Sequence, residues 1–534
     1  MAFLRAEKKK SGSYLRIVES YKDKRKSRHR TLHSLGKVED YPPQQLEKIG
    51  KKLLELSGKK FEDLSGKDFE EMGRFNYGYA LLIKKLFQEF DINTWARKVS
   101  RKHRVSFDWI AALKIMIAER LNAPSSKRAG YFHQEEYLGL SNQSIELQHF
   151  YRTLDILNEN KEQLKAHLFK QHQNLFTARL DLVFYDVTTL YFDSQIEEED
   201  SLRQRGFSKD GKAHKTQVVL GLLVDKLRNP ISYHVYRGNT YEGQTMQDAL
   251  KLLQSKYKID NVVVVADSAM IDKANRDFID QTDGLTYIIG DRIKNLPRQL
   301  SDYLLNRENH RQLSNGDDSY SYASYEWQGR RIICTYSERR AKKDRYEREK
   351  LIQKARKLLE NPANLHQLRK RGAGRFIKES PKGSYQLDLE KMCGDEKWDG
   401  YKAIATTTEL EAPQVLAKYR DLFEVEHAFR TLKSQLEIRP IFHWTNQRIE
   451  GHIAMCFLAF IFLNYVRNIT GLQYQAIIKA LDLMQVSQVK ENASNSCFYL
   501  RSKVDEKQEI IINKLKMSIP GHTNSETTIK QYFI

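Results

Sequence analysis

Cysteine is scarce in this chain of 534 residues, which has only four, Cys334, Cys393, Cys456 and Cys497, and no two of them form a CxxC pair. This scarcity excludes a zinc ribbon and a disulfide framework, and it fits a reducing cytoplasm. The N-terminal sequence MAFLRAEKKK lacks the apolar segment of a signal peptide. The longest apolar run, Ile453 to Val466, is too short to span a bilayer and predicts a buried helix. We therefore expect a cytoplasmic protein that does not contact a membrane.

Acidic residues are also under-represented. Lys and Arg number 89 against 69 Asp and Glu, which gives a net charge of +20 and a pI of about 9.4. A charge this large favours a polyanionic partner, most often nucleic acid. A generally basic soluble protein, such as a ribosome-associated factor, has the same composition and stays open at this point.

Two regions precede the main β-rich part of the chain. Residues 1–69 predict short strands, with a hairpin of residues 14–21 and 31–36 around a basic turn that runs from Lys22 to Arg30. This turn could lie against phosphates, and a solvated turn is the equal alternative. Residues 70–178 predict helices, one of them capped by Ser106. They form a candidate DNA-binding region, although core packing alone also explains their apolar periodicity.

From residue 179 the pattern becomes β-rich, and the chain as a whole is expected to be a multidomain α/β protein. Residues 179–304 predict strands at 182–192, 216–225, 231–236, 261–267 and 285–290, with a helix at 245–257. Residues 305–396 predict an insertion that contains a strand at 331–336 and a very basic helix at 339–357. Residues 397–480 return to the first pattern with a strand at 401–406, and residues 481–534 indicate only a polar tail.

Three carboxylates stand out within this layout. Asp186 lies in the middle of a strand, where an unpaired buried charge is costly. Asp267 ends a strand that reads as buried on both faces, at the edge where open α/β sheets place ligands. Glu426 lies on a predicted single helix from Tyr419 to Lys433, and these three residues, seven apart, form one stripe beside the apolar face. An amphipathic helix with ordinary surface charges is the plainer interpretation of the stripe alone.

Adjacent strands and a helix packed on them can bring Asp186, Asp267 and Glu426 to one edge of a sheet. Carboxylate oxygens are the ligands that Mg²⁺ prefers, and a pair of such ions supports phosphodiester chemistry. In a basic protein the natural substrate is a nucleic acid backbone. Other carboxylates compete for this role, namely Asp193, Asp272, Asp421 and Glu424.

With these motifs the chain resembles the DDE transposases of bacterial insertion sequences, in the insertion-sequence-four group. The stretch FEVEHAFRTLKSQLEIRPIFHW is similar to the sixteen-thirty-four branch of that group. The group's pattern around the third acid is Y-x2-R-x3-E-x6-K, which the chain matches at Tyr419, Glu426 and Lys433. It departs from the pattern at Leu422, where the group has arginine; Arg420 and Arg430 are the neighbouring replacements, and Arg430 is the better placed. The first two acids match in YDVTT around Asp186 and in VADS around Asp267.

The resemblance implies a ribonuclease-H-like catalytic domain, a mixed sheet with helices, interrupted by an insertion. It implies that Asp186, Asp267 and Glu426 hold two Mg²⁺ ions, with Mn²⁺ able to replace them. Water would nick the transposon end, and the freed 3′-OH would attack the opposite strand or the target DNA. Tyr419, Lys433 and Arg430 would contact DNA, and Trp398 or Trp327 would stack on a base, although a packed tryptophan is the plainer alternative for both.

The resemblance also implies double-stranded DNA partners, the terminal inverted repeats and the target, and a homodimer on paired ends in the bacterial nucleoid. Two alternatives from other classes stay open. One is a non-catalytic DNA-binding descendant of a transposase, and the other is a ribonuclease-H-like structure-specific nuclease.

Overall fold

The computed structural model describes residues 2–9, 11–23, 26–57, 68–140, 144–176, 182–208, 211–212, 214–227, 229–257, 262–268, 270, 273–315, 318–360, 372–380, 384–492 and 494–533. Lys24 and Arg25 of the predicted basic turn, and the competing carboxylate Asp272, lie outside these residues. The chain forms two compact units, Met1–Glu71 with Val489–Cys497, and Met72–Gln488 with Phe498–Ile534.

The first unit contains the predicted hairpin. Strands β2 (Gly12–Asp23) and β3 (Lys26–Lys37) pair antiparallel, and β1 (Ala2–Lys9) adds a third antiparallel strand on the other side of β2. Helix α1 (Pro43–Leu56) follows. The hairpin expected at residues 14–36 is therefore confirmed.

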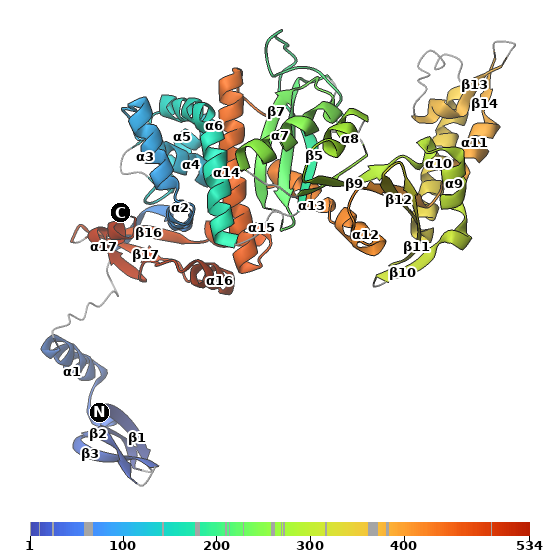
Figure 1. Ribbon diagram of the computed structural model, residues 1–534. Coiled ribbons are helices and arrows are strands. Elements are labelled where there is room, and N and C mark those ends of the chain that lie inside the picture. Colours follow the sequence, from blue (N-terminus) through green and yellow to red (C-terminus); the bar gives the residue numbers. More distant parts are fainter. Residues whose placement is uncertain are drawn as a thin grey trace. The chain divides into compact units, whose positions relative to one another are not determined.

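The second unit is built on a nine-stranded sheet with the order β10-β11-β12-β15-β9-β8-β5-β6-β7 (Figure 1). Its strands are β5 (Leu182–Tyr191), β6 (Gln217–Asp225), β7 (Pro230–Arg237), β8 (Val262–Ala266), β9 (Leu285–Asp291), β10 (Arg311–Asn315), β11 (Asp318–Trp327), β12 (Arg330–Tyr336) and β15 (Tyr401–Thr406). β8 runs parallel to β5 and to β9, whereas the other neighbours are antiparallel. The strands expected between residues 182 and 290 are all present, and their apolar runs are buried because helices cover the sheet.

The predicted insertion, residues 305–396, contributes strands to this same sheet. β15 pairs on one side with β9 and on the other with β12, so that β10, β11 and β12 continue the sheet beyond its central part. The segment also holds the basic helix α10 (Glu338–Glu360), the pair β13 (Ile377–Glu379) and β14 (Tyr385–Leu387), and α11 (Leu389–Glu396).

Helices lie on both faces of the sheet, where two apolar clusters are buried. They are α2 (Gly78–Glu89), α3 (Ile92–His103), α4 (Trp109–Asn122), α5 (Lys127–His133) and α6 (Leu147–Phe176), and, within the β-rich part, α7 (Thr245–Tyr257), α8 (Lys273–Asp280) and α9 (Arg298–Leu305). Asp108, rather than the predicted Ser106, caps α4, because the Asp108 side chain accepts a hydrogen bond from the amide of Ala111.

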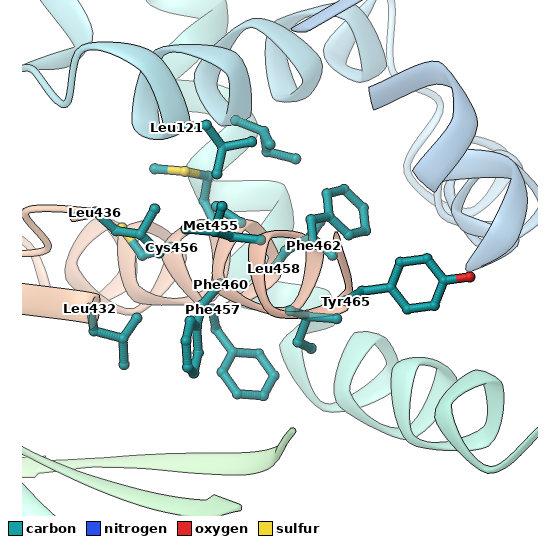
Figure 2. Packing of buried hydrophobic residues seen from close by; sticks show 14 of the residues in the cluster. Leu121, Leu432, Leu436, Met455, Cys456, Phe457, Leu458, Phe460, Phe462 and Tyr465 are labelled. Atoms are coloured by element: carbon teal, nitrogen blue, oxygen red, sulfur yellow. The ribbon is translucent and has the colours of Figure 1, made fainter. Parts of the chain in front are cut away.

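Helix α14 (Asn446–Thr470) is the centre of the core and contacts α4, α6 and β7. Figure 2 shows Met455, Phe457 and Phe462 projecting from it in different directions among its neighbours. Among the described residues it is the one helix long and apolar enough to cross a membrane by length and composition, and 94% of its most apolar window is buried inside the structure. The buried helix expected at residues 453–466 is present.

Residues 481–534, for which the sequence indicated only a tail, are folded. They hold β16 (Gln485–Glu491), β17 (Ser496–Arg501), α16 (Glu506–Leu515), β18 (Thr523–Ser525) and α17 (Glu526–Gln531), and α15 (Tyr474–Asp482) precedes them. The strands form a sheet of order β18-β17-β16-β4, in which β4 (Phe69–Asn76) is the partner from the other end of the sequence. Ile511, Leu515 and Ile529 belong to the main apolar core.

Candidate functional site

Asp186 and Asp267 occupy equivalent places on adjacent parallel strands. The pairing of β5 with β8 runs from Leu182 opposite Val263 to Phe184 opposite Val265. Each aspartate lies two residues beyond the last of these pairs, and neighbouring strands are about 4.8 Å apart. Asp186 is half-buried and Asp267 is exposed. The register therefore brings the first two predicted acids to one edge of the sheet.

Each aspartate is held by the backbone that follows it. Oδ1 of Asp186 accepts a hydrogen bond from the amide of Val187 at 2.8 Å, and Oδ1 of Asp267 accepts one from the amide of Ser268 at 2.7 Å. These bonds limit the rotation of each carboxylate.

Glu426 approaches Asp186 from helix α13 (Phe423–Ser434), which packs on β5 and β6. The helix buries Val425, Ala428, Phe429 and Leu432 against the core and leaves Glu426 exposed. Asp186 and Glu426 line one hollow of about 360 Å³, together with Thr188, Arg430, Lys433 and Arg439. The hollow therefore combines two of the predicted acids with the predicted DNA contacts Arg430 and Lys433.

Asp267 lines a neighbouring hollow of about 450 Å³ with Tyr419 and Lys402. The Tyr419 hydroxyl occupies the space beside Gly290, where a Cβ atom on that glycine would lie 2.5 Å from the hydroxyl oxygen. The Lys402 ammonium lies 4.4 Å from the centre of the Tyr419 ring. A phenol and an ammonium thus stand next to the second acid.

The charges of Asp267 and Glu426 both affect the pKa of Tyr419 and the pKa of Lys402. Burial raises the pKa of Tyr419 well above its usual range, and the Asp267 carboxylate, which also shares a hydrogen bond with the phenol, and Glu426 raise it further. Burial lowers the pKa of Lys402, as does the charge of Arg340, while Asp267 and Glu426 oppose this shift. Tyr419 is consequently a protonated hydrogen-bond donor at neutral pH.

The single helix expected from Tyr419 to Lys433 is wrong. Tyr419 lies near the end of α12 (Ala412–Arg420), and α13 begins at Phe423 after a break at Asp421 and Leu422. α12 packs on β8 and β9, whereas α13 packs on β5 and β6. Because neighbouring strands of a sheet are twisted relative to one another, a single straight helix does not follow both pairs, and the break lets each segment follow its own.

The donor set fits a divalent metal ion by its chemistry, since it consists of three carboxylates at one sheet edge. Within the described parts of the chain, however, no three His, Cys, Asp or Glu side chains are gathered closely enough to hold an ion. The register of β5 and β8 aligns Asp186 with Asp267, and Asp186 shares a hollow with Glu426. To share an ion, the three side chains would have to come closer to one another.

Comparison with known families identifies the family of the chain. A model described as the transposase DDE domain matches residues 178–462, more than half of the chain. The chain belongs to the DDE transposase family. A second model, described as the N-terminal domain of IS1634 family transposases, matches residues 4–63, which confirms the resemblance to the sixteen-thirty-four branch.

The chain of this DDE transposase family member was also compared with curated proteins and with solved structures. No curated protein matches it. Among solved structures, the Mos1 transposase paired-end complex with left transposon end is similar at 12% identity and a TM-score of 0.15. This match covers 33% of the present chain and 57% of the Mos1 chain, so the present chain spans little more than half of that relative.

Trp398 does not line the hollow of Asp186 and Glu426. It is half-buried, packs against the apolar cluster on one face of the sheet, and has the Lys397 ammonium 4.6 Å from its ring centre. It lines a hollow of about 310 Å³ that also contains Asp395 and Arg375 and that shares Lys294, Arg340 and Tyr401 with the Asp267 hollow. Trp327 packs against the same cluster.

Sequence reasoning assigned no role to Lys402 and did not single out Arg340, two of the four cations that line the Asp267 hollow with Tyr419. Lys402 carries a weak signal, since it is a lone charge in the strand YKAIAT. Arg340 carries none, because it is one of many cations in the basic segment at 339–357. Only the pairing of β15 with β9 and β12 places both beside the predicted acids.

Proposed function

We propose that this chain is a DNA transposase that binds the ends of an insertion sequence, cleaves them with Mg²⁺-activated water and joins the 3′-OH ends to target DNA. The observation that carries the proposal is the register of β5 and β8, which aligns Asp186 with Asp267, together with the hollow that Asp186 shares with Glu426. The family match supports the same chemistry.

The catalytic part would be a ribonuclease-H-like domain. Its support is the strand order β7-β6-β5-β8-β9, in which three antiparallel strands are followed by two parallel ones. Helices α7 and α8 supply the crossovers to the parallel strands. The helical residues 70–178 and the basic N-terminal residues 1–69 are the proposed DNA-binding regions, in line with the net charge of +20.

Asp186, Asp267 and Glu426 would hold two Mg²⁺ ions, or Mn²⁺ in their place. Such a pair of ions supplies charge that activates an attacking oxygen and stabilises the leaving oxygen. Lys433 and Arg430, in the same hollow as two of the acids, would bind the phosphate and orient it. Tyr419, kept protonated by burial and by Asp267, would donate a hydrogen bond to a phosphate oxygen.

The partners of the reaction would be the terminal inverted repeats and the target, both double-stranded DNA. Because two ends must be held together, a homodimer on paired ends is proposed, and the bacterial cytoplasm, at the nucleoid, is the proposed location. The net charge of +20 supports a DNA partner.

The first test is cleavage and joining. The chain is incubated, with Mg²⁺ or Mn²⁺, with duplexes that carry the inverted repeats flanking its own coding region, and with a target plasmid. We expect cleavage at the repeat end and covalent joining of the 3′ end to the plasmid. Binding without nicking in either metal would instead identify a DNA-binding descendant of a transposase. Cleavage that ignores the repeat and never joins strands would identify a structure-specific nuclease.

A second prediction concerns Gly290, whose missing side chain leaves room for the Tyr419 hydroxyl. The change Gly290→Ala places a methyl group 2.5 Å from that oxygen and displaces the phenol. Because small displacements at a reacting centre are costly, end cleavage should fall about tenfold to a hundredfold. The measurement is the single-turnover cleavage rate.

Two variants make this prediction specific. The change Tyr419→Phe removes the atom that collides most closely, so Gly290→Ala should cost much less when it is added to that variant; what remains is the approach to the Ser268 amide at 3.2 Å and to Asp267 Oδ1 at 3.4 Å. The matched control is Gly394→Ala, where an added Cβ meets no atom within 4 Å. A loss of the same size when Gly290→Ala is combined with Tyr419→Phe would show that Gly290 acts through some other contact.

A further inference from the structure

A basic hollow of about 590 Å³ adjoins the Asp267 hollow and shares Tyr419, Lys402 and Arg340 with it. Five of its lining residues are cations, and its described lining contains no carboxylate. The lining is made of Tyr320, Thr335, Ser337, Arg339, Arg340, Lys343, Lys402, Ile404, Leu416, Tyr419 and Arg420. A concave surface with this charge attracts an anion.

Three cations of the basic hollow, Lys343, Arg340 and Lys402, are only weakly compensated by protein groups. Lys343 lies 3.8 Å from Glu347 and Arg340 lies 3.4 Å from Asp344, both as partly exposed pairs on α10. Exposed pairs of this kind contribute little, and they leave the guanidinium or ammonium available to a stronger anion. In the described part of the chain, Lys402 forms no ion pair, although it is half-buried against Tyr419.

The position at which the family pattern has arginine cannot serve this surface. Leu422 is only 9% exposed and belongs to the main apolar core, so its side chain does not reach DNA. Arg430, the replacement favoured by the helical wheel, lines the hollow of Asp186 and Glu426 instead. Arg420 lies in the basic hollow, where it donates a hydrogen bond to the Tyr320 hydroxyl at 2.9 Å. Lys402 and Arg340 are the two cations that line both the basic hollow and the Asp267 hollow, each of which Tyr419 also lines.

We propose that Lys402, from β15, and Arg340, from α10, bind a backbone phosphate of the DNA strand beside Tyr419, in place of the arginine that is missing at position 422. This inference rests on the proposed function, because it assumes a DNA strand at the carboxylates. Lys402 acts as a point charge at the base of the hollow, and Arg340 presents a planar donor fork from its rim. Both are binding residues for the DNA backbone near the cleaved bond.

The test combines charge removal in the protein with charge removal in the DNA. Lys402→Gln and Arg340→Gln keep most of the length of the side chains and are made singly and together, with Lys354→Gln, an exposed cation on the same helix outside the hollow, as the matched control. Duplexes that carry the terminal repeat contain one uncharged methylphosphonate at each phosphate in turn near the cleavage position. Thermal melting checks that each variant is folded.

In the unmodified chain, one or two methylphosphonate positions should reduce the cleavage rate about tenfold or more, the size of a lost charge-assisted contact. In the double variant the same positions should cost less than about twofold, because the contact is already absent. Lys354→Gln should behave like the unmodified chain. Equal sensitivity to methylphosphonate in the double variant and in the unmodified chain would overturn the inference.

A binding measurement separates this inference from the proposed function. Fluorescence anisotropy over a range of KCl concentrations gives the salt slope of duplex binding, which should fall by about 1 in the double variant, the value for one lost phosphate contact. An unchanged slope counts against the site even if cleavage is affected. If the unmodified chain cleaves no DNA in Mg²⁺ or Mn²⁺, the proposed function fails, and the salt slope still decides whether Lys402 and Arg340 bind phosphate.

Discussion

Replacing Asp267 by asparagine is expected to reduce end cleavage about a thousandfold or more while leaving the protein bound to its DNA. The change removes an ionised oxygen donor from the proposed metal site but keeps the shape of the side chain. Charge stabilisation by a metal ion is worth several kcal/mol, and each 1.4 kcal/mol is a factor of about ten in rate. Asp186→Asn and Glu426→Gln should have effects of the same size. The measurement is single-turnover cleavage with Mg²⁺, beside an electrophoretic assay of binding.

The matched control is Asp193→Asn. Asp193 follows β5 in the chain and was a competing carboxylate by sequence, but its side chain forms an ion pair with Lys215 at 2.5 Å and is 61% exposed. We expect its loss to change cleavage less than about threefold, since an exposed pair contributes at most about 1 kcal/mol. Full cleavage by Asp186→Asn, Asp267→Asn or Glu426→Gln would remove the metal-site assignment.

Replacing Phe462 by alanine is expected to lower the free energy of unfolding of the second unit by about 3–5 kcal/mol, the usual cost of deleting a buried aromatic ring. Phe462 is fully buried on α14, with its ring 5.9 Å from that of Phe87 and 5.5 Å from that of Phe90, centre to centre. The variant removes apolar contacts between α14 and the end of α2 and leaves a cavity. Urea unfolding followed by circular dichroism measures the change, and α14 should be lost together with its neighbours.

Phe442→Ala is the control for this prediction. Phe442 lies shortly before α14 and is 58% exposed, so its removal creates no cavity, and stability should change by less than about 0.5 kcal/mol. If Phe462→Ala were as mild as Phe442→Ala, α14 would not be the centre of the core. Since α14 contacts both α4 and β7, such a result would also weaken the link between the helical region and the sheet.

Most of the strands and helices were predictable because the local pattern of apolar and polar residues depends directly on which side chains are buried. The apolar run at 261–267 predicts a strand covered on both faces, and β8 is that strand. The basic segment at 339–357 predicts a helix, and α10 covers it. The break between α12 and α13 was not predictable, because the apolar spacing that runs to Leu432 already begins at Leu422, inside the break, and only the twist of the underlying sheet separates the two helices.

The sequence by itself determined the family and the carboxylates at the centre of the proposal, Asp186, Asp267 and Glu426. A charge inside an apolar strand, or at its end, is costly unless it has a function or a partner, so residue type and local pattern were sufficient to select the two aspartates. Family recognition then rested on short motifs around these residues and around Glu426, which the matches to the DDE domain and the IS1634 N-terminal domain confirm.

Only the tertiary structure decided which cations lie beside these acids. Lys402 and Arg340 reach Tyr419 because β15 joins the sheet between β9 and β12, a pairing between segments far apart in the sequence. The structure likewise showed that residues 481–534 are folded around β4 and the main core. Contacts of this kind depend on strand order and on the twist of the sheet, and neither can be predicted from the positions of charges along a basic chain.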